Sequence, residues 1–276
     1  MRTKAYHRPR SLEEAWKLKA VDPDARFIAG GTDLMVGHRP PERLISLRAI
    51  PGLAGIEFDE TTRIGALTPI SDLLEHEGIA VRFPAIRRAC HLFASVQIRN
   101  AATVGGNLCN ASPAADLGPP LLIHGARVRL SAPRGTREVA LEEFLLGPGQ
   151  TCMEDDELLT EVFLDAPSPE ARTAFMRKTR VRMDIAMASI AALIEMGGGV
   201  CRMARIAAGA VAPVPMRLTQ VEQLLEGERI TPALVKEASE LAVRSVRPID
   251  DVRTTAAYRR RLIGVYVRRT IEELTR

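Results

Sequence analysis

One stretch of the chain has the composition of an anion-binding loop. It runs from Ala101 to Leu122 and contains Gly105, Gly106 and Asn107. Glycines leave backbone N–H groups uncovered, and asparagine side chains can hydrogen-bond locally so that neighbouring amides stay free. Consecutive free amides form a concavity that binds anions, and a helix beginning near Pro113 would add its positive end. We therefore predict a phosphate or pyrophosphate clamp, although Gly-Gly also marks plain turns.

A second glycine-rich turn follows a short predicted strand near the N-terminus. The strand spans residues 26–29, and the turn continues it with the sequence AGGTDL. This is not the GxGxxG fingerprint that the doubly wound nicotinamide-binding fold carries after its first strand. The sequence therefore argues against a nicotinamide-binding domain of that type. Thr32 and Thr103 are also compatible with ordinary hydroxyls in turns.

Length and hydrophobicity indicate a globular protein. The chain has 276 residues, of which 46% are hydrophobic, enough for one large or two ordinary domains with buried cores. The longest apolar runs, such as residues 186–194, are too short to span a bilayer, and residues 1–10 lack the apolar core of a signal peptide. We therefore expect a cytoplasmic protein without a membrane span.

Cysteine, histidine and arginine residues form none of the usual metal or nucleic-acid motifs. The four cysteines, Cys90, Cys109, Cys152 and Cys201, include no CxxC pair, and the five histidines include no HExxH pattern. We expect reduced, packed thiols and no metal site. The net charge is +4, with arginines gathered in residues 259–269, but basic residues do not alternate with aromatics. This arginine-rich helix is a solvated face or a docking surface for an acidic partner, not a nucleic-acid site.

Residue periodicity predicts the elements that position the two loops. Helices are expected at residues 11–20 behind a capping box, at a short segment capped by Thr68 or Ser71, and at 84–94. Strands are expected at 44–47, in hairpins at 56–58 with 63–67 and 126–130 with 136–139, and in an edge-like strand at 157–164.

A break in composition at residues 165–170, which include Pro167 and Pro169, predicts a boundary between domains 1–168 and 169–276. Beyond it, the sequence predicts a strand at 173–179 and a long apolar hairpin at 185–196 and 200–211, followed by helices at 216–225, 231–246 and 254–273. Strands followed by helices indicate an α+β layer in which helices cover a sheet.

With both loops placed, the whole chain resembles the FAD-binding medium subunit of the molybdenum hydroxylase family, which includes xanthine and carbon monoxide dehydrogenases. Two glycine-rich loops of this kind at this separation are specific, whereas either alone is weak. The segments that carry the resemblance are AGGTDL at 29–34, FASVQIRNAATVGGNLCNASPAADLGP at 93–119, ELLTEV at 157–162, RMDIA at 182–186 and PIDDVRTTAAYRRRL at 248–262.

The resemblance implies an α+β fold with a two-subdomain FAD-binding unit of the vanillyl-alcohol oxidase type. The subdomains would span about 1–52 and 53–168, and a C-terminal domain would contain a three-stranded antiparallel sheet and helices. The residues expected to wrap the FAD pyrophosphate and ribityl chain are Phe27, Ile28, Ala29, Gly30, Gly31, Thr32, Asp33, Leu34, Thr103, Val104, Gly105, Gly106 and Asn107. Those expected further along the cofactor are Asn110 and Asp116 at the ribityl and pyrophosphate region, Phe93 with Leu158 or Leu159 at the isoalloxazine, and a basic residue at Arg177 or Lys178.

Two of these residues keep a second interpretation. A carboxylate at Asp116 would repel a pyrophosphate, so it fits better as an acceptor from a ribityl or ribose hydroxyl, or as a first-turn helix residue after Pro113. Phe93 could provide an apolar wall for the flavin or simply belong to the core.

The resemblance also implies a role in electron transfer without a catalytic residue in this chain. The chain has no cysteine framework for an iron–sulfur cluster, lacks a cysteine-bearing insertion and is too short to add a molybdopterin domain. A small subunit with [2Fe-2S] clusters and a large molybdenum subunit are therefore expected as partners, in a dimer of heterotrimers. Electrons would leave through FAD to NAD, a quinone or dioxygen. The alternatives are a self-contained FAD-dependent oxidoreductase and a non-catalytic nucleotide-binding module.

Overall fold

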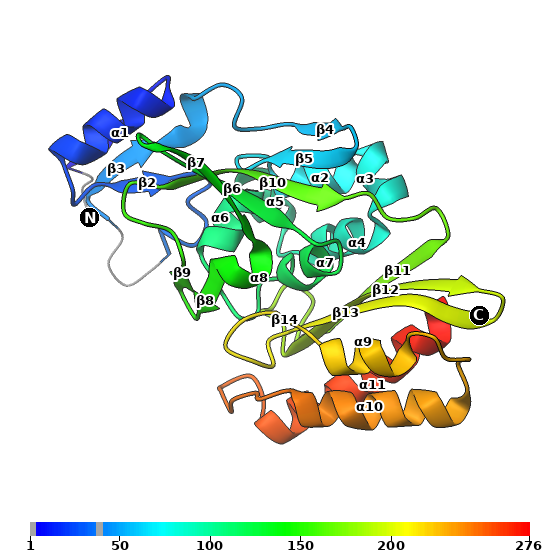
Figure 1. The fold of residues 1–276 in the computed structure, drawn as a ribbon. Helices are drawn as coiled ribbons and strands as arrows, with labels where there is room; N and C mark the ends of the chain where they lie inside the picture. Colours follow the sequence, from blue (N-terminus) through cyan, green and yellow to red (C-terminus); the bar gives the residue numbers. More distant parts are fainter. Residues whose placement is uncertain (1–3, 37–40) are drawn as a thin grey trace.

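A computed structural model describes residues 4–36 and 41–276 of the chain (Figure 1). The strands in these residues are β1 (Ala5–His7), β2 (Arg26–Ile28), β3 (Arg43–Ser46), β4 (Ile56–Phe58), β5 (Thr61–Gly65), β6 (Arg127–Ala132), β7 (Gly135–Ala140), β8 (Leu145–Gly147), β9 (Gln150–Thr151), β10 (Leu158–Asp165), β11 (Ala171–Lys178), β12 (Ala188–Gly197), β13 (Val200–Gly209) and β14 (Met216–Arg217). The helices are α1 (Leu12–Val21), α2 (Ile70–Glu75), α3 (Glu77–Arg82), α4 (Pro84–Leu92), α5 (Val96–Ala101), α6 (Val104–Cys109), α7 (Gly118–Leu122), α8 (Leu141–Phe144), α9 (Thr219–Leu225), α10 (Pro232–Ser245) and α11 (Ala256–Leu274), with a 3₁₀ turn at Leu47–Ala49.

A small parallel sheet in the order β1-β3-β2 forms the N-terminal part, with α1 packed beside it. The predicted cap of α1 is confirmed, because the Ser11 hydroxyl accepts a hydrogen bond from the Glu14 amide at 3.2 Å. The Glu14 carboxylate in turn accepts from the amide of Arg10 at 2.7 Å rather than from that of Ser11. Ala15 and Ile45 are fully buried in the core of this part.

A five-stranded sheet in the order β4-β5-β10-β6-β7 forms the next layer, and its neighbours are antiparallel. The prediction that residues 157–164 form an edge-like strand is wrong, because β10 lies at the centre of this sheet. Glu161, which gives the strand its polar character, is neutralised on one face by Arg63 and Arg129 from the flanking strands. Val162 points to the other face and is fully buried.

Helices α2 to α7 lie between the five-stranded sheet and the C-terminal sheet (Figure 1). Neither predicted cap of α2 is used, since Pro69 precedes its first turn. The Thr68 hydroxyl instead exchanges hydrogen bonds with the backbone N–H and C=O of Gly55, both at 3.0 Å. Ser71 lies inside the helix and donates to Asp72 at 3.2 Å.

The C-terminal sheet has the order β11-β12-β13-β14 and is antiparallel throughout. Ala191 and Leu193 of β12 face the core beneath the five-stranded sheet, whereas Ile190 and Ala192 face helices α9 to α11 on the other side (Figure 1). Both faces of β12 are therefore buried, which explains the continuous apolar run in its sequence.

The C-terminal sheet contains one strand more than the three implied by the sequence. The helix predicted at 216–225 starts later, because its first residues pair with β13 as β14. The Leu218 amide donates to the carbonyl of Ile206 at 2.7 Å. Arg217 forms an ion pair with Glu222 at 2.6 Å, which joins the short strand to α9.

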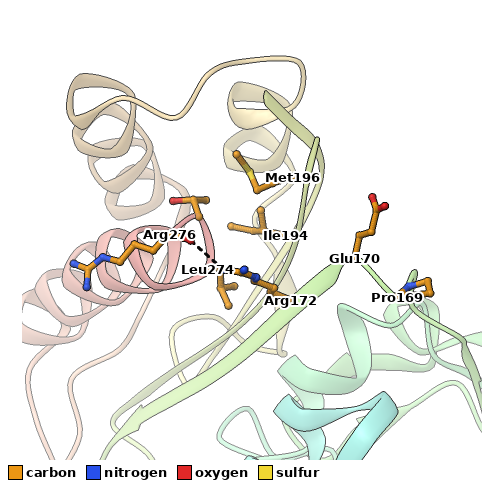
Figure 2. A pocket seen from close by; sticks show the side chains of 8 residues that line it. Pro169, Glu170, Arg172, Ile194, Met196, Leu274 and Arg276 are labelled. Carbon is orange, nitrogen blue, oxygen red and sulfur yellow. Dashed lines mark hydrogen bonds between the residues drawn. The ribbon is translucent and has the colours of Figure 1, made fainter. Parts of the chain in front are cut away.

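The described residues contain no helix that is long and apolar enough to cross a membrane. They also contain no group of three or more histidine, cysteine, aspartate or glutamate side chains suited to a metal; His38 lies outside them. All four cysteines are free, and Cys90 and Cys201 are buried as expected. Cys109 is exposed, so packing does not shield every thiol. Figure 2 shows a hollow at the end of α11, lined by Arg172 and Ile194 among others.

His124, at the end of α7, is buried without a hydrogen-bond partner for either ring nitrogen among the described residues. Its ring packs edge-on against Phe83, with centroids 4.8 Å apart. Burial lowers the pKa of His124 from 6.5 to about 3, and the nearby Arg205 charge adds to this effect while Asp165 opposes it. The imidazole is therefore neutral in the folded protein.

We expect acid to destabilise the fold through His124. Its pKa is lower in the folded than in the unfolded chain, so the unfolded chain binds a proton first as the pH falls below 6.5. Stability should then decrease by up to about 1.4 kcal/mol per pH unit between pH 6 and pH 4. Denaturant unfolding at several pH values measures this slope. In the His124→Leu variant, the part of the pH slope that comes from this histidine should be absent. Equal slopes in the wild-type chain and the variant would contradict the role given to His124.

Candidate functional site

The two glycine-rich loops lie against each other. A Cβ atom added to Gly30 would lie 2.0 Å from the carbonyl oxygen of Ala101 and 3.0 Å from the Cα of Ala102, so only glycine permits this approach. Arg48 joins the loops from the side, since Nε donates to the carbonyl of Ala29 at 3.1 Å and Nη2 to that of Ala101 at 3.5 Å. No motif in the sequence indicates this role of Arg48.

The first loop presents free backbone amides. It leaves β2 after Ile28 and turns through Gly31, which has a φ of +73°. In the parts of the chain that the structure describes, the N–H groups of residues 32–34 have no hydrogen-bond acceptor, while the next amide, of Met35, donates back to Gly31 at 3.1 Å. Consecutive unpaired amides in such a turn are suited to an anion.

The second loop differs from the prediction, because much of it is helix α6 rather than an open loop. The Gly105 amide donates to the carbonyl of Ala66 at 2.8 Å, and the Gly106 amide donates to the Thr103 hydroxyl at 3.1 Å. Thr103 is thus the cap of α6, and the expected nest of free amides at these glycines is wrong. Gly105 is needed for packing, since a Cβ would lie 2.7 Å from that of Ala66.

The helix expected near Pro113 is also displaced. The next helix, α7, begins at Gly118, and Pro119 and Pro120 occupy its first turn, where proline is tolerated. Pro113 lies in the preceding turn, and its carbonyl accepts a hydrogen bond from the Ala210 amide at 2.7 Å. The segment between α6 and α7 is therefore attached to the C-terminal sheet.

Two buried side-chain oxygens in this region lack a hydrogen-bond donor. They are Oδ1 of Asn107 and Oδ1 of Asp116, for which no partner is found among residues 4–36 and 41–276. A buried polar atom is normally paired, so unpaired acceptors indicate a missing donor such as a hydroxyl. Asn110, which caps the end of α6, is exposed instead.

The other oxygen of Asp116 pairs with Arg177 from β11. Both side chains are nearly buried, at 10% and 4% exposure. Burial raises the pKa of Asp116, and the Arg177 charge opposes this shift. Arg177 also donates to the carbonyl of Arg182 at 3.0 Å, whereas Lys178 is exposed. Of the two basic candidates, the structure places Arg177 beside Asp116.

The three apolar candidates occupy different surroundings. Phe93 ends α4 and is partly buried against the main core, and its carbonyl accepts from Arg99 at 2.8 Å. The following Ala94 has a φ of +33°, an unusual conformation that Arg99 also supports by a 3.3 Å hydrogen bond. Leu158 and Leu159 are almost fully buried and belong to two different cores. Sequence reasoning missed Arg99.

The remaining candidates lie on or beside the two loops. Phe27 and Ile28 are partly buried on β2, and Phe27 packs against the N-terminal core. Asp33 is exposed and Leu34 is partly buried in the first loop. Val104 is fully buried in the first turn of α6, so its side chain serves the core.

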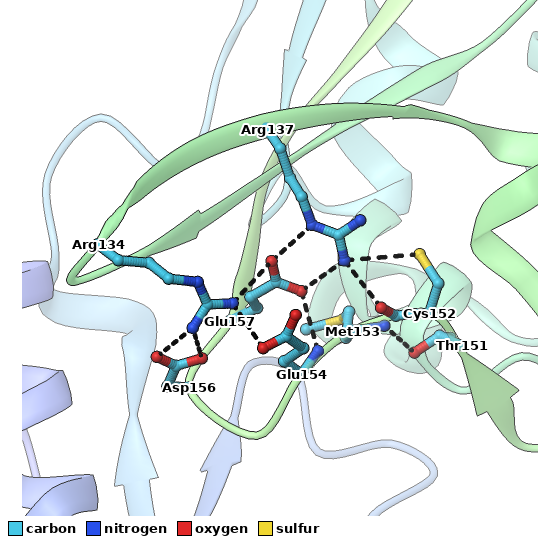
Figure 3. Close-up of polar contacts among 8 residues, drawn as sticks. All are labelled: Arg134, Arg137, Thr151, Cys152, Met153, Glu154, Asp156 and Glu157. Carbon is cyan, nitrogen blue, oxygen red and sulfur yellow. Dashed lines mark hydrogen bonds and ion pairs between the residues drawn. The ribbon is translucent and has the colours of Figure 1, made fainter.

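A cluster of charged residues fixes the segment that enters β10 (Figure 3). Its centre is Glu157, whose side chain is 2% exposed and accepts two hydrogen bonds from Arg137 at 2.7 and 2.9 Å and one from the Glu154 amide at 2.9 Å. Arg134 bridges this carboxylate and Asp156. The pKa of Glu157 is lowered, chiefly by the hydrogen bonds from Arg137, so this carboxylate is ionised at neutral pH.

These features together suit a nucleotide with phosphates and hydroxyl groups. Free amides of residues 32–34 can hold an anion, and the unpaired oxygens of Asn107 and Asp116 can accept from hydroxyls. The carboxylate at Asp116 does not repel an anion strongly, because Arg177 neutralises it.

Two family models together cover nearly the whole chain. The "FAD binding domain in molybdopterin dehydrogenase" matches residues 2–167, and the "CO dehydrogenase flavoprotein C-terminal domain" matches residues 173–274. The first match alone includes more than half of the 276 residues.

Similar proteins and structures agree with these matches over nearly their full lengths. The chain is 32% identical to the xanthine dehydrogenase FAD-binding subunit of Escherichia coli (98% of this chain, 95% of the relative) and 34% identical to the carbon monoxide dehydrogenase medium chain of Afipia carboxidovorans (97% and 95%). A solved carbon monoxide dehydrogenase from Hydrogenophaga pseudoflava superposes with a TM-score of 0.95 at 31% identity, covering 99% of this chain and 97% of that one. The chain therefore belongs to the family of FAD-binding medium subunits of the molybdenum hydroxylases.

Proposed function

We propose that this chain passes electrons from the iron–sulfur clusters of a partner subunit to an external acceptor such as NAD, a quinone or dioxygen. A bound flavin accepts electrons singly or in pairs, and so links one-electron clusters to a two-electron acceptor. The family membership supports the cofactor. The buried, unpaired Oδ1 of Asp116 is the observation that carries the proposal, because it calls for a hydroxyl donor beside the two loops.

Particular residues of the chain would hold FAD. The amides of residues 32–34 would bind the pyrophosphate, and Gly30 would keep the two loops in contact. Gly31 would turn the first loop, and Thr103 would cap α6 beside it. Oδ1 of Asp116 and Oδ1 of Asn107 would accept from hydroxyls of the cofactor. Phe93, with Leu158 or Leu159, would contribute the apolar wall near the ring and exclude water from it.

The assembly is also a proposal. Relatives are named as medium chains or FAD-binding subunits, which supports a small iron–sulfur subunit and a large molybdenum subunit as separate partners, in a dimer of heterotrimers. We place the complex in the cytoplasm, in keeping with four free cysteines. Within the chain, residues 1–168 would form the FAD-binding domain and 169–276 the C-terminal domain, and the turn at Pro167 to Glu170 between β10 and β11 supports that boundary.

The purified chain should bind one FAD and show a flavin absorption spectrum. Anaerobic addition of a reduced iron–sulfur partner should bleach the spectrum, and the acceptor that restores it identifies the exit route. A chain that stays colourless in excess FAD would support the nucleotide-binding module instead. A chain that oxidises a small organic substrate without partners would support the self-contained oxidoreductase.

A further inference from the structure

The segment PIDDVRTTAAYRRRL at residues 248–262 forms a turn and then the first two turns of α11, which begins at Ala256 (Figure 1). Asp251 organises this turn, because its Oδ1 accepts hydrogen bonds from the amides of Arg253 at 2.9 Å and Thr254 at 3.2 Å. The Asp250 side chain accepts from the Ala256 amide at the start of the helix. None of these residues lies in the two glycine-rich loops.

Arg259 connects this turn to the C-terminal sheet. It is only 3% exposed, and its Nη1 donates to the carbonyls of Met187 at 2.6 Å and Ala210 at 2.9 Å. Its Nη2 forms an ion pair with Oδ2 of Asp251 at 2.8 Å. One buried guanidinium thus joins the residue before β12, the residue after β13 and the turn before α11, and a buried charge is tolerated only with such partners.

Both carbonyls belong to residues whose backbone N–H groups hold the wall of the candidate site. The Ala210 amide donates to the carbonyl of Pro113 at 2.7 Å, three residues before Asp116. Ala210 has a φ of +62°, an unusual backbone conformation that the hydrogen bond from Arg259 to its carbonyl supports. The segment that carries Asp116 is therefore two hydrogen bonds away from Arg259.

The second carbonyl is attached to the segment that carries Arg177. The Met187 amide donates to the carbonyl of Lys178 at 2.7 Å and closes the loop from 179 to 186. Within that loop, the carbonyl of Arg182 accepts from Arg177. Arg259 thus holds, through Met187, the base of the loop that contains the Arg182 carbonyl.

We propose that Arg259 is a positioning residue of the flavin site, holding Asp116 and Arg177 in register through the backbones of residues Ala210 and Met187. This inference rests on the proposed FAD-binding function. Arg259 acts through backbone hydrogen bonds, so its loss releases both sides of the site while leaving their side chains unchanged.

The test compares the full-length Arg259→Met variant with the wild-type chain. Without FAD, hydrogen exchange at the amides of Met187 and Ala210 should become faster, while amides in the centre of β12 keep their protection. The dissociation constant of FAD, measured by flavin fluorescence, should rise about tenfold because the binding site is less preorganised. The matched control is Arg217→Met, which breaks an ion pair with Glu222 in the same domain and should change the constant less than about twofold.

The outcomes distinguish failure of the proposed FAD-binding function from failure of the positioning role of Arg259. If the wild-type chain does not bind FAD, the proposed function fails, and the exchange data alone decide whether Arg259 holds the two peptides. If the wild-type chain binds FAD and Arg259→Met binds it equally well, the positioning role is wrong. Should Arg259→Met fail to fold, Asp251→Asn keeps the acceptor for the turn amides but removes the charge partner. That variant should weaken FAD binding about threefold, and unchanged binding would contradict the proposal.

Discussion

FAD binding should be lost in the Gly30→Ala variant, with an affinity at least about 100-fold below that of the wild-type chain. The added methyl group would lie 2.0 Å from the carbonyl oxygen of Ala101 and 2.7 Å from its carbon. These are backbone atoms, and the neighbouring Ala102 carbonyl is fixed by the Ile70 amide at 3.0 Å. The first loop must therefore move away from the end of α5, which changes the direction of the free amides of residues 32–34.

The same variant should keep most of its fold. The overpacking lies between two loops at the surface of the cores, so the expected loss of unfolding free energy is about 1–3 kcal/mol. Gly147→Ala is a suitable control, because its Cβ would meet only the end of the Gln150 side chain, at 3.2 Å. FAD titration and denaturant unfolding of the three proteins measure both effects. Retention of FAD by Gly30→Ala at wild-type affinity would show that contact between the loops is not needed for the site.

Glycine-rich composition indicated two segments that meet in the fold, but it did not show what each glycine does. The pattern around Gly105 and Gly106 was interpreted as exposed backbone, whereas Thr103 caps a helix there and the amides are paired. Threonine is also a common N-cap of helices, and sequence alone does not decide between an open nest and a capped helix start at Thr103. The free amides lie in the other loop, after Gly31.

Interactions between distant segments were the least predictable part of the site. Residues 157–164 were predicted as an edge-like strand, but Glu161 within them pairs with Arg63 and Arg129 from the strands on either side. Arg48 and Arg259 bind backbone carbonyls, which have no signature in the sequence. Elements with strong local patterns, such as the β12–β13 hairpin and helix α10, appear within a few residues of their predicted positions.

Replacing Arg177 with methionine should destabilise the chain by about 3–5 kcal/mol at pH 7, because it leaves the Asp116 carboxylate buried without its partner. The double variant Asp116→Asn/Arg177→Met removes both charges and should lose less stability than Arg177→Met alone. Denaturant unfolding of the wild-type chain and the two variants measures the difference. A loss below about 1 kcal/mol in Arg177→Met would mean that the ion pair adds little to the fold.

The pH dependence gives this prediction its sharpest test. Burial raises the pKa of Asp116 above 3.8 in the folded chain, and loss of the Arg177 charge should raise it further. The folded chain then holds this proton to a higher pH than the unfolded chain. The destabilisation by the buried carboxylate is therefore absent below the pKa of the unfolded chain, and it grows as the pH rises through the pKa of the folded chain. Arg177→Met should therefore regain stability relative to the wild-type chain on acidification from pH 7 to pH 5, and the double variant should not. Equal pH slopes for Arg177→Met and the double variant would place the lost stability in packing of the arginine side chain rather than in its charge.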